Sequence, residues 1–265
     1  MNVLVTNDDG FCAWGIETLV KCLSEKHNVF VLAPCSNRSG NSVHINLFTP
    51  LEMKKINDAA WTCEGTPADC VNIGLKGDLF NVKIDAVVSG INKGENLGTD
   101  IVYSGTCGAA KQAVLCGVPG IAVSMQLFDA SKDWDNKDAW HFDSLGKFVS
   151  DNLEKLCSLC DVSDKGFMAE KKCVFVNVNA YSFLKFKGVK FTELCFKEYV
   201  NDSVEFNNSG GKINVNFLGG PSLFKSRSYS DMEACREGYI SVSRVFAEPC
   251  CPPMSNNLDS IQFSL

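Results

Sequence analysis

The sequence predicts an α/β protein with a Rossmann-like, mostly parallel sheet that is flanked by helices. Short apolar runs without polar alternation, at residues 3–5, 29–33 and 121–125, are typical of parallel strands buried on both faces. Between the first two runs, residues 15–27 repeat apolar side chains at the spacing of one helix face. A strand–helix–strand unit of this kind makes a right-handed crossover in a parallel sheet.

Later segments continue the alternation of helices and strands. Thr66 and Pro67 are the residue types of a helix N-cap and a first helical position. Residues 85–89 predict another strand, and residues 142–159 carry the apolar face of a helix that contains the chain's CxxC motif. Residues 173–178 predict the last strong strand of the core.

The character of the chain changes after this core. Over residues 186–245 helical periodicity fades, and β-type segments such as 188–192 predict a C-terminal antiparallel extension of the main sheet. We therefore divide the chain into a Rossmann-like catalytic core (1–185), a β-rich extension that returns to the core (186–245) and a weakly ordered tail (246–265).

Composition limits the possible classes of function. At 265 residues with 45% hydrophobic side chains, the chain has ample material for one large packed domain or a domain with an arm. Its net charge of −6 argues against a nucleic-acid-binding protein, which would be basic. No apolar run approaches about 18 residues, so we expect no membrane-spanning helix and no membrane partner. The first strand lacks a basic and apolar leader, which favours a cytoplasmic location.

The 14 cysteines are expected to be reduced and structural. They are scattered among apolar neighbours, as at Cys22 and Cys70, where a thiol acts as a small apolar side chain. A chain of this size has no need of disulfide stabilisation. Cys157 and Cys160 form one CxxC motif, which is weak evidence for zinc without a second pair.

Two adjacent carboxylates follow the first predicted strand. Asp8 and Asp9 come directly after the buried segment, and Gly10 permits the turn that must follow. Neighbouring acids at the end of a buried strand repel each other and lose hydration, so a divalent cation would stabilise them. An aspartate in this position can also act simply as a helix N-cap.

Polar residues follow two further strands at what should be the same edge of the sheet. Ser39 lies in the loop after the second strand, and Asn92 follows the strand that begins at residue 85. Ligands of open α/β sheets bind outside the carboxyl ends of the strands. Together with the two aspartates, these residues offer only oxygen ligands, which suit magnesium, manganese or calcium better than zinc or copper.

A helix start lies shortly after Asn92. Ser104, Gly105 and Thr106 would expose backbone N–H groups at the positive end of the helix dipole, which is a ready site for phosphate. Capping by Ser104 is compatible with this role. A cation beside such a helix end suggests phosphoryl chemistry, because the cation would polarise a phosphoryl oxygen and lower the pKa of a bound water.

Six short motifs occur in order along the chain: residues 6–10 (TNDDG), 37–39 (NRS), 65–71 (GTPADCV), 89–92 (SGIN), 103–106 (YSGT) and 237–241 (EGYIS). Together they resemble the SurE family of metal-dependent 5′-nucleotidases. The first five cover most of residues 1–125 with matching spacing. The resemblance fades over residues 128–232 and ends after residue 245.

The resemblance implies hydrolysis of nucleoside 5′-monophosphates, often with broad phosphatase activity. It also implies a homodimer or homotetramer built partly through the C-terminal arm. The expected cofactor is a divalent cation, Mg²⁺ or Mn²⁺, with Ca²⁺ a further possibility. The residues that match the family's sites are the metal ligands Asp8, Asp9, Ser39 and Asn92, the catalytic residues Asp8, Asp9 and Asn92, and the phosphate-binding residues Asn96, Ser104, Gly105 and Thr106.

Some features depart from the family or leave the mechanism open. His44 and Asn46 replace the usual serine and threonine after the Ser39 loop. His44 could donate a proton to the leaving alkoxide, although a loop histidine without a catalytic role is the better interpretation. The nucleophile is either a water, which we favour, or the carboxylate of Asp8 or Asp9.

Three rival classes share parts of this pattern. A haloacid-dehalogenase-like phosphatase uses an aspartate nucleophile after its first strand, but it places one residue between its two aspartates. A dinucleotide-dependent oxidoreductase needs GxGxxG after that strand, which residues 8–12 lack. A non-catalytic relative that binds a nucleotide or metal would keep the fold but could lose ligand residues from its site. The intact set of oxygen ligands argues against this class.

Overall fold

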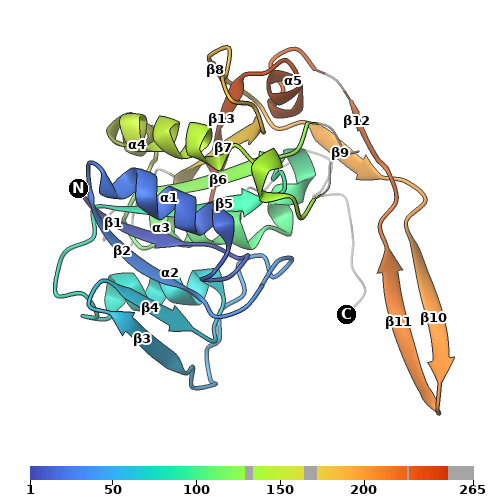
Figure 1. Ribbon diagram of the computed structural model, residues 1–265, viewed down its shortest axis with the longest axis horizontal. Coiled ribbons are helices and arrows are strands. Elements are labelled where there is room, and N and C mark those ends of the chain that lie inside the picture. Colours follow the sequence, from blue (N-terminus) through green and yellow to red (C-terminus); the bar gives the residue numbers. More distant parts are fainter. Residues whose placement is uncertain (129–133, 164–171, 226, 250–265) are drawn as a thin grey trace, which may run out of the picture.

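The computed structural model of the protein describes residues 1–128, 134–163, 172–225 and 227–249. The strands of its main sheet are β1 (Asn2–Thr6), β2 (Asn28–Pro34), β3 (Met53–Asn57), β4 (Ala60–Cys63), β5 (Ala86–Lys93), β6 (Gly120–Gln126), β7 (Val174–Tyr181), β8 (Val189–Phe191) and β13 (Ile240–Phe246). They lie in the order β3-β4-β2-β1-β5-β6-β7-β13-β8 (Figure 1). The strands from β4 to β7 are parallel, whereas β3 and β13 run antiparallel to β4 and β7. The predicted mostly parallel sheet is confirmed.

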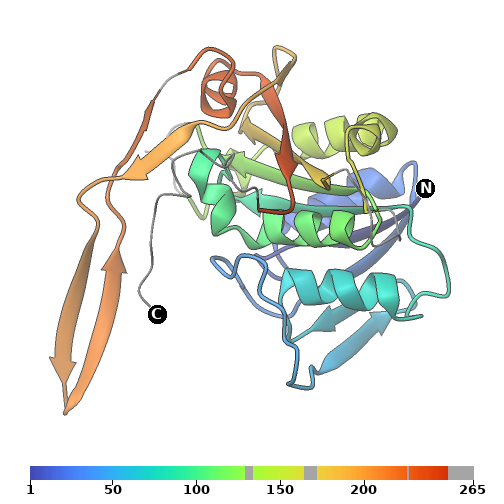
Figure 2. The same ribbon diagram turned by 180° about the vertical axis from the view of Figure 1, so that it is seen from behind.

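Helices cover both faces of this sheet: α1 (Trp14–Ser24), α2 (Pro67–Lys76), α3 (Gly105–Leu115) and α4 (Phe142–Ser158), with the short 3-10 helices η1 (Gly98–Val102) and η2 (Lys137–Ala139). Helices α1 and α4 pack side by side over one face, and α2 and α3 pack together over the other (Figures 1 and 2). No helix of the described ranges is both long and apolar enough to cross a bilayer.

Alternate residues of β1 face the two layers of the core. Val3 and Val5 pack in the cluster that includes the apolar faces of α1 and α4. Leu4 packs in the opposite cluster with Leu32 and Val87, under α2 and α3. Leu32 lies in β2 and Val87 in β5, the two strands that flank β1 in the sheet. The continuous apolar run of β1 therefore reflects burial on both faces, as predicted.

Helix α2 begins as the sequence predicts. The Thr66 hydroxyl accepts from the N–H of Asp69 at 3.2 Å, and the Thr66 N–H donates to Asp69 Oδ2 at 2.9 Å, which completes a capping box. Pro67 occupies the first turn, where its missing N–H costs nothing.

The extension forms an arm that projects from the body (Figure 1). It consists of β9 (Phe196–Tyr199), β10 (Ser203–Ser209), β11 (Lys212–Leu218) and β12 (Ser222–Lys225). Strands β10 and β11 pair as an antiparallel hairpin, and β12 pairs antiparallel with β9. The antiparallel C-terminal extension is confirmed, with one correction: β9 to β12 form two separate two-stranded sheets, and only β8 and β13 join the main sheet.

Three smaller predictions need correction. The short helix α5 (Asp231–Arg236) was not predicted, because six residues are too few to show helical periodicity. Helix α4 ends at Ser158, so Cys160 lies beyond the helix that was expected to contain it; both cysteines of the CxxC motif are free thiols. Strand β13 reaches Phe246, one residue into the predicted tail, and residues 250–265 of that tail lie outside the described residues.

Candidate metal and phosphate site

The N-terminus of α3 holds the carboxylate of Asp8. The Thr106 hydroxyl donates to Asp8 Oδ1 at 2.5 Å, and the Thr106 N–H donates to Oδ2 at 3.1 Å. Ser104 caps the helix, because its hydroxyl accepts from the N–H of Cys107 at 3.0 Å. A Cβ atom at Gly105 would lie 2.9 Å from Asp8 Oδ2, so only glycine allows this close approach. Thr106 is thus engaged by the protein's own carboxylate, and the phosphate role of Ser104, Gly105 and Thr106 stays a prediction.

A tight turn after β1 presents the two aspartates. The side-chain amide of Asn7 donates to the carbonyl of Gly10 at 2.8 Å. Gly10 has φ of +104°, a conformation that favours glycine, as the sequence analysis predicted. The other side-chain atom of Asn7, Oδ1, is buried without a hydrogen-bond partner among the described residues. This buried acceptor immediately precedes Asp8, and such groups normally have a partner in a complete site.

Burial raises the pKa of both aspartates. For Asp8, burial outweighs the hydrogen bonds from Thr106, which favour the ionised form and lower the pKa. For Asp9, burial raises the pKa to about 6; the N–H of Lys93 opposes the rise and the charge of Asp8 adds to it. Two adjacent carboxylates that lose hydration in this way would be stabilised by a cation.

The end of β5 brings Asn92 to the aspartates. The N–H of Lys93 donates to Asp9 Oδ2 at 2.9 Å, and the side-chain amide of Asn92 donates to the carbonyl of Gly94 at 3.0 Å. Strand β5 continues to Lys93, beyond the predicted end at Ser89, with an irregularity in its pairing to β6. These additional residues carry the strand up to Asp9.

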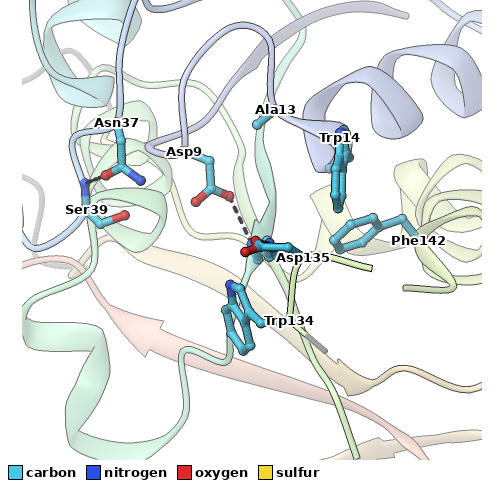
Figure 3. Close-up of a pocket in the computed structure, with 10 residues that line it drawn as sticks. Asp9, Ala13, Trp14, Asn37, Ser39, Trp134, Asp135 and Phe142 are labelled. Carbon is cyan, nitrogen blue, oxygen red and sulfur yellow. Dashed lines mark hydrogen bonds and ion pairs between the residues drawn. The ribbon is translucent and has the colours of Figure 1, made fainter. Parts of the chain in front are cut away.

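The loop after β2 approaches the same place. The N–H of Arg38 donates to the backbone carbonyl of Asp8 at 2.7 Å, and the N–H of Ser39 donates to Asn37 Oδ1 at 2.8 Å. Figure 3 shows Asn37, Ser39 and Asp9 around one opening. Three of the loops that were expected to meet at one sheet edge therefore do meet there.

The side-chain oxygens at this edge of the sheet suit a hard divalent cation as ligands. Asp9 Oδ1, Asn92 Oδ1 and Ser39 Oγ accept no hydrogen bond from any described residue, so these oxygens are available. The described part of the chain contains no cluster of three or more His, Cys, Asp and Glu side chains suited to a metal. A cation held by the two aspartates would therefore need amide, hydroxyl and water oxygens as well. Magnesium commonly binds in this way, with one or two carboxylates and several waters.

Asn96 is buried and held by the neighbouring strands. Its N–H donates to Asn179 Oδ1 at 2.9 Å, and its carbonyl accepts from the amides of Asn177 at 2.9 Å and Asn179 at 3.1 Å. Its own side-chain amide donates to Ser124 Oγ at 2.7 Å. Asn177 and Asn179 are not among the site residues predicted from the sequence, although two asparagines in an otherwise apolar buried strand are a recognisable pattern. The role of Asn96 in phosphate binding stays a prediction.

A buried ion pair connects the loop around Asn96 to the arm. Lys197 of β9 has only 4% of its side chain exposed, and its Nζ lies 2.6 Å from Glu95 Oε1 and 2.6 Å from Asp100 Oδ2. The hydroxyl of Tyr199 also donates to Asp100, at 2.9 Å. Burial alone would lower the pKa of Lys197, but the two carboxylates outweigh it and raise the pKa. The loop between β5 and α3 is therefore held by a charged lysine from the extension.

Comparison with known proteins decides the family. The family model described as survival protein SurE matches residues 3–201. This chain belongs to the SurE family. A SurE protein structure from Aquifex aeolicus has a TM-score of 0.73 to it, with 30% sequence identity and coverage of 98% of both chains. The protein named 5′-nucleotidase SurE of Campylobacter jejuni is 34% identical over 93% of this chain and 92% of its own length. Its namesake in Treponema pallidum is 42% identical over 69% of this chain and 91% of its own.

His44, one of the departures from the SurE pattern, is exposed in a loop. Its carbonyl accepts from the Thr66 hydroxyl at 2.5 Å, and its N–H donates to the carbonyl of Asn41 at 3.1 Å. Asn46 donates its N–H and its side-chain amide to the carboxylate of Asp69, at 2.9 and 2.6 Å. These contacts fasten the loop to α2 and support the interpretation of His44 as a loop residue.

In this member of the SurE family a cleft of about 430 Å³ opens beside Asp9 (Figure 3). Asp9, Asn37 and Ser39 contribute polar atoms to its wall. Trp14 and Trp134 contribute aromatic surface. Two of the predicted metal ligands, Asp9 and Ser39, thus border a space large enough for a small organic molecule.

Proposed function

We propose that this SurE-family protein hydrolyses nucleoside 5′-monophosphates to a nucleoside and phosphate, with a divalent cation, Mg²⁺ or Mn²⁺, as cofactor. Its class, a phosphomonoesterase hydrolase, follows from the family, whose curated members in C. jejuni and T. pallidum are named 5′-nucleotidases. The observation that carries the metal requirement is the pair of adjacent carboxylates, Asp8 and Asp9, whose pKa values are raised by burial at the carboxyl edge of a parallel sheet.

Each polar residue of the site receives a role in this proposal. Asp8, Asp9, Ser39 and Asn92 would hold the cation, which when bound would polarise a phosphoryl oxygen and offset the negative charge at phosphorus. Asp8, Asp9 and Asn92 are the residues to which we assign catalysis. Thr106 orients Asp8 through its two hydrogen bonds, and the N–H of Lys93 orients Asp9.

Phosphate would lie against the start of α3. Ser104 is the N-cap of an 11-residue helix that begins with Gly105 and Thr106, and the helix dipole favours an anion at this end. Asn96 would contribute from the loop before it. Both oxygens of Asp8 accept from Thr106, which disfavours Asp8 as a nucleophile, so we propose that a water attacks phosphorus.

The direct test measures phosphate release from a panel of nucleoside monophosphates in EDTA and after restoring Mg²⁺, Mn²⁺ or Ca²⁺. We expect activity that is lost in EDTA and returns with Mg²⁺ or Mn²⁺. Asp9→Asn should lose this activity while it keeps the fold. Asp58→Asn, which changes an exposed carboxylate in the turn between β3 and β4, should be as active as wild type. Release that persists in EDTA or in Asp9→Asn would refute the metal site.

We further propose that residues 1–185 are the catalytic core and that residues 186–245 are an arm for assembly into a homodimer or homotetramer. The hairpin of β10 and β11 supports this proposal. Val204 lies opposite Phe217 and Phe206 opposite Val215, so these side chains share one face of the hairpin. All of them are exposed, and Phe217 is 84% exposed. A contiguous apolar face of this kind is typical of a surface that another subunit covers.

A cytoplasmic location is also part of the proposal. Two cysteines, Cys12 and Cys35, are exposed as free thiols. Free thiols persist where the environment is reducing. Immunolocalisation after cell fractionation would test this location.

A further inference from the structure

The cleft beside Asp9 has an aromatic wall that the metal and phosphate sites do not require. Trp14, at the start of α1, and Trp134, shortly before η2, both line it (Figure 3). The ring of Trp134 packs edge-on against Trp140 with centroids 4.9 Å apart, and Trp140 stacks on Phe142 at 5.3 Å. The indole N–H of Trp140 also donates to the carbonyl of Trp134 at 3.0 Å.

This packing holds an exposed ring in a defined orientation. Trp140 and Phe142 are buried, whereas Trp134 remains 44% exposed. An indole that only filled the core would be covered in the way that these two neighbours are. Trp134 instead presents aromatic surface to the cleft, supported from behind by buried rings.

Lys93 connects this wall to the carboxylate pair. Its N–H donates to Asp9, while its Nζ lies 5.0 Å from the ring centre of Trp14 and 5.3 Å from that of Trp134. The same Nζ pairs with Asp135 Oδ1 at 3.2 Å. Lys93 therefore contacts Asp9 through its backbone N–H and both indoles through its side chain, so the rings lie one residue's reach from the Asp9 carboxylate.

We propose that Trp14 and Trp134 bind the base of the substrate by stacking, and that they make the enzyme selective for purine nucleoside 5′-monophosphates over base-free phosphate esters. This inference rests on the proposed function and adds the base site to it. Every base can stack on an aromatic side chain, and such stacking contributes strongly to nucleotide binding. Purines have a larger aromatic face than pyrimidines and should therefore stack more strongly. Besides its pair with Asp135, the ammonium group of Lys93 offers further N–H donors beside the rings, and purine ring nitrogens can accept from them.

The base site can be tested without turnover. Adenosine has the base but no phosphate, so its binding in EDTA can be followed by quenching of tryptophan fluorescence. We expect saturable quenching by adenosine and guanosine, weaker binding of cytidine, and no quenching by ribose. Trp14→Leu and Trp134→Leu keep apolar bulk but remove the aromatic face, and each should raise the Kd for adenosine by about 5- to 150-fold. Trp134→Tyr should restore most of the affinity.

Trp61 supplies the matched control. It lies on β4, outside the cleft, with Lys55 Nζ 5.7 Å from its ring centre, so it is also a tryptophan paired with a lysine. Trp61→Phe should reduce the total fluorescence and leave the Kd for adenosine unchanged. Near-ultraviolet circular dichroism on each variant would show that the packing of the remaining aromatic residues is preserved.

Turnover distinguishes the two proposals. In Mg²⁺, Trp134→Leu should lower kcat/KM for AMP by the same factor as it raises the Kd, and should leave kcat/KM for ribose 5-phosphate unchanged. Equal losses for both esters, or wild-type protein that hydrolyses AMP without binding adenosine, would overturn the base site alone. Adenosine binding in a protein that releases no phosphate from any ester would refute the proposed hydrolysis and leave the base site standing.

Discussion

Thr106 binds both oxygens of the Asp8 carboxylate, through its hydroxyl at 2.5 Å and its backbone N–H at 3.1 Å. The contact joins the end of β1 to the start of α3 across 98 positions of sequence. Charge-assisted hydrogen bonds and the helix dipole favour the ionised carboxylate, whereas burial opposes it and raises the pKa. A bound cation would add the stabilisation that these hydrogen bonds do not supply.

The Thr106 hydroxyl can be removed without changing the size of the side chain. Thr106→Val leaves one oxygen of a buried carboxylate without its donor, so we expect unfolding in urea to become easier by about 1–3 kcal/mol. Phosphate release should fall at least about 10-fold, since 1.4 kcal/mol in the orientation of Asp8 corresponds to that factor. Thr106→Ser keeps the hydroxyl and should retain most of both properties. A fully active and stable Thr106→Val would show that the contact is dispensable.

The stability of the metal-free protein should decrease as pH rises through the titration of Asp9. Its pKa in the folded protein is about 6, above the ordinary value of 3.8, so between these values the folded state binds more protons than the unfolded state. Stability is therefore greatest below about pH 4 for this group and is lost by about pH 6, by up to about 3 kcal/mol. Asp8, whose pKa is also raised, contributes in the same direction.

Urea unfolding in EDTA at several pH values between 4 and 7 would measure this loss. Asp9→Asn should show a shallower pH dependence and should be at least as stable as wild type at pH 7. Adding Mg²⁺ at pH 7 should stabilise wild type and have little effect on Asp9→Asn. Identical pH profiles for the two proteins would contradict the assignment of a raised pKa to Asp9.

Lys197 should be far more important for stability than an exposed lysine in the same extension. Lys197→Met leaves Glu95 and Asp100 as uncompensated, mostly buried charges, so we expect a loss of about 3–5 kcal/mol in urea unfolding. Because these carboxylates flank Asn96, the KM for nucleotide should also rise. Lys190→Met removes the exposed pair with Glu237 and should leave urea unfolding almost unchanged, because water screens such a pair. Equal effects of the two substitutions would refute this role of Lys197.

The apolar face of the hairpin should determine the oligomeric state. Phe217→Glu places a charge on that face, opposite Val204, and we expect it to shift the protein to a smaller species in analytical ultracentrifugation. Asn214→Glu places the same charge on the opposite face of the same strand, where its cross-strand neighbour is the neutral Asn207, and should leave assembly unchanged. A shift in oligomeric state with the opposite-face variant alone, or with neither variant, would show that the hairpin is not part of the interface.

Much of the fold and part of the site were predictable because their causes are local. The apolar run of β1, the turn at Gly10 and the capping box of Thr66 each depend on residues within a few positions of one another. The shared edge of the sheet followed from a general rule for parallel strands, and it correctly predicted that Ser39 would lie near Asp9.

The sequence by itself therefore determined the parallel core, the helix starts and the loops that carry oxygen ligands. Only the tertiary structure decided that Thr106 binds Asp8, that Asn179 holds Asn96 and that Lys197 lies buried beside that loop. The partners in these contacts are about 80 to 100 positions apart. No local pattern encodes such pairs, because burial and the requirement that buried polar groups find partners act only once the chain is packed.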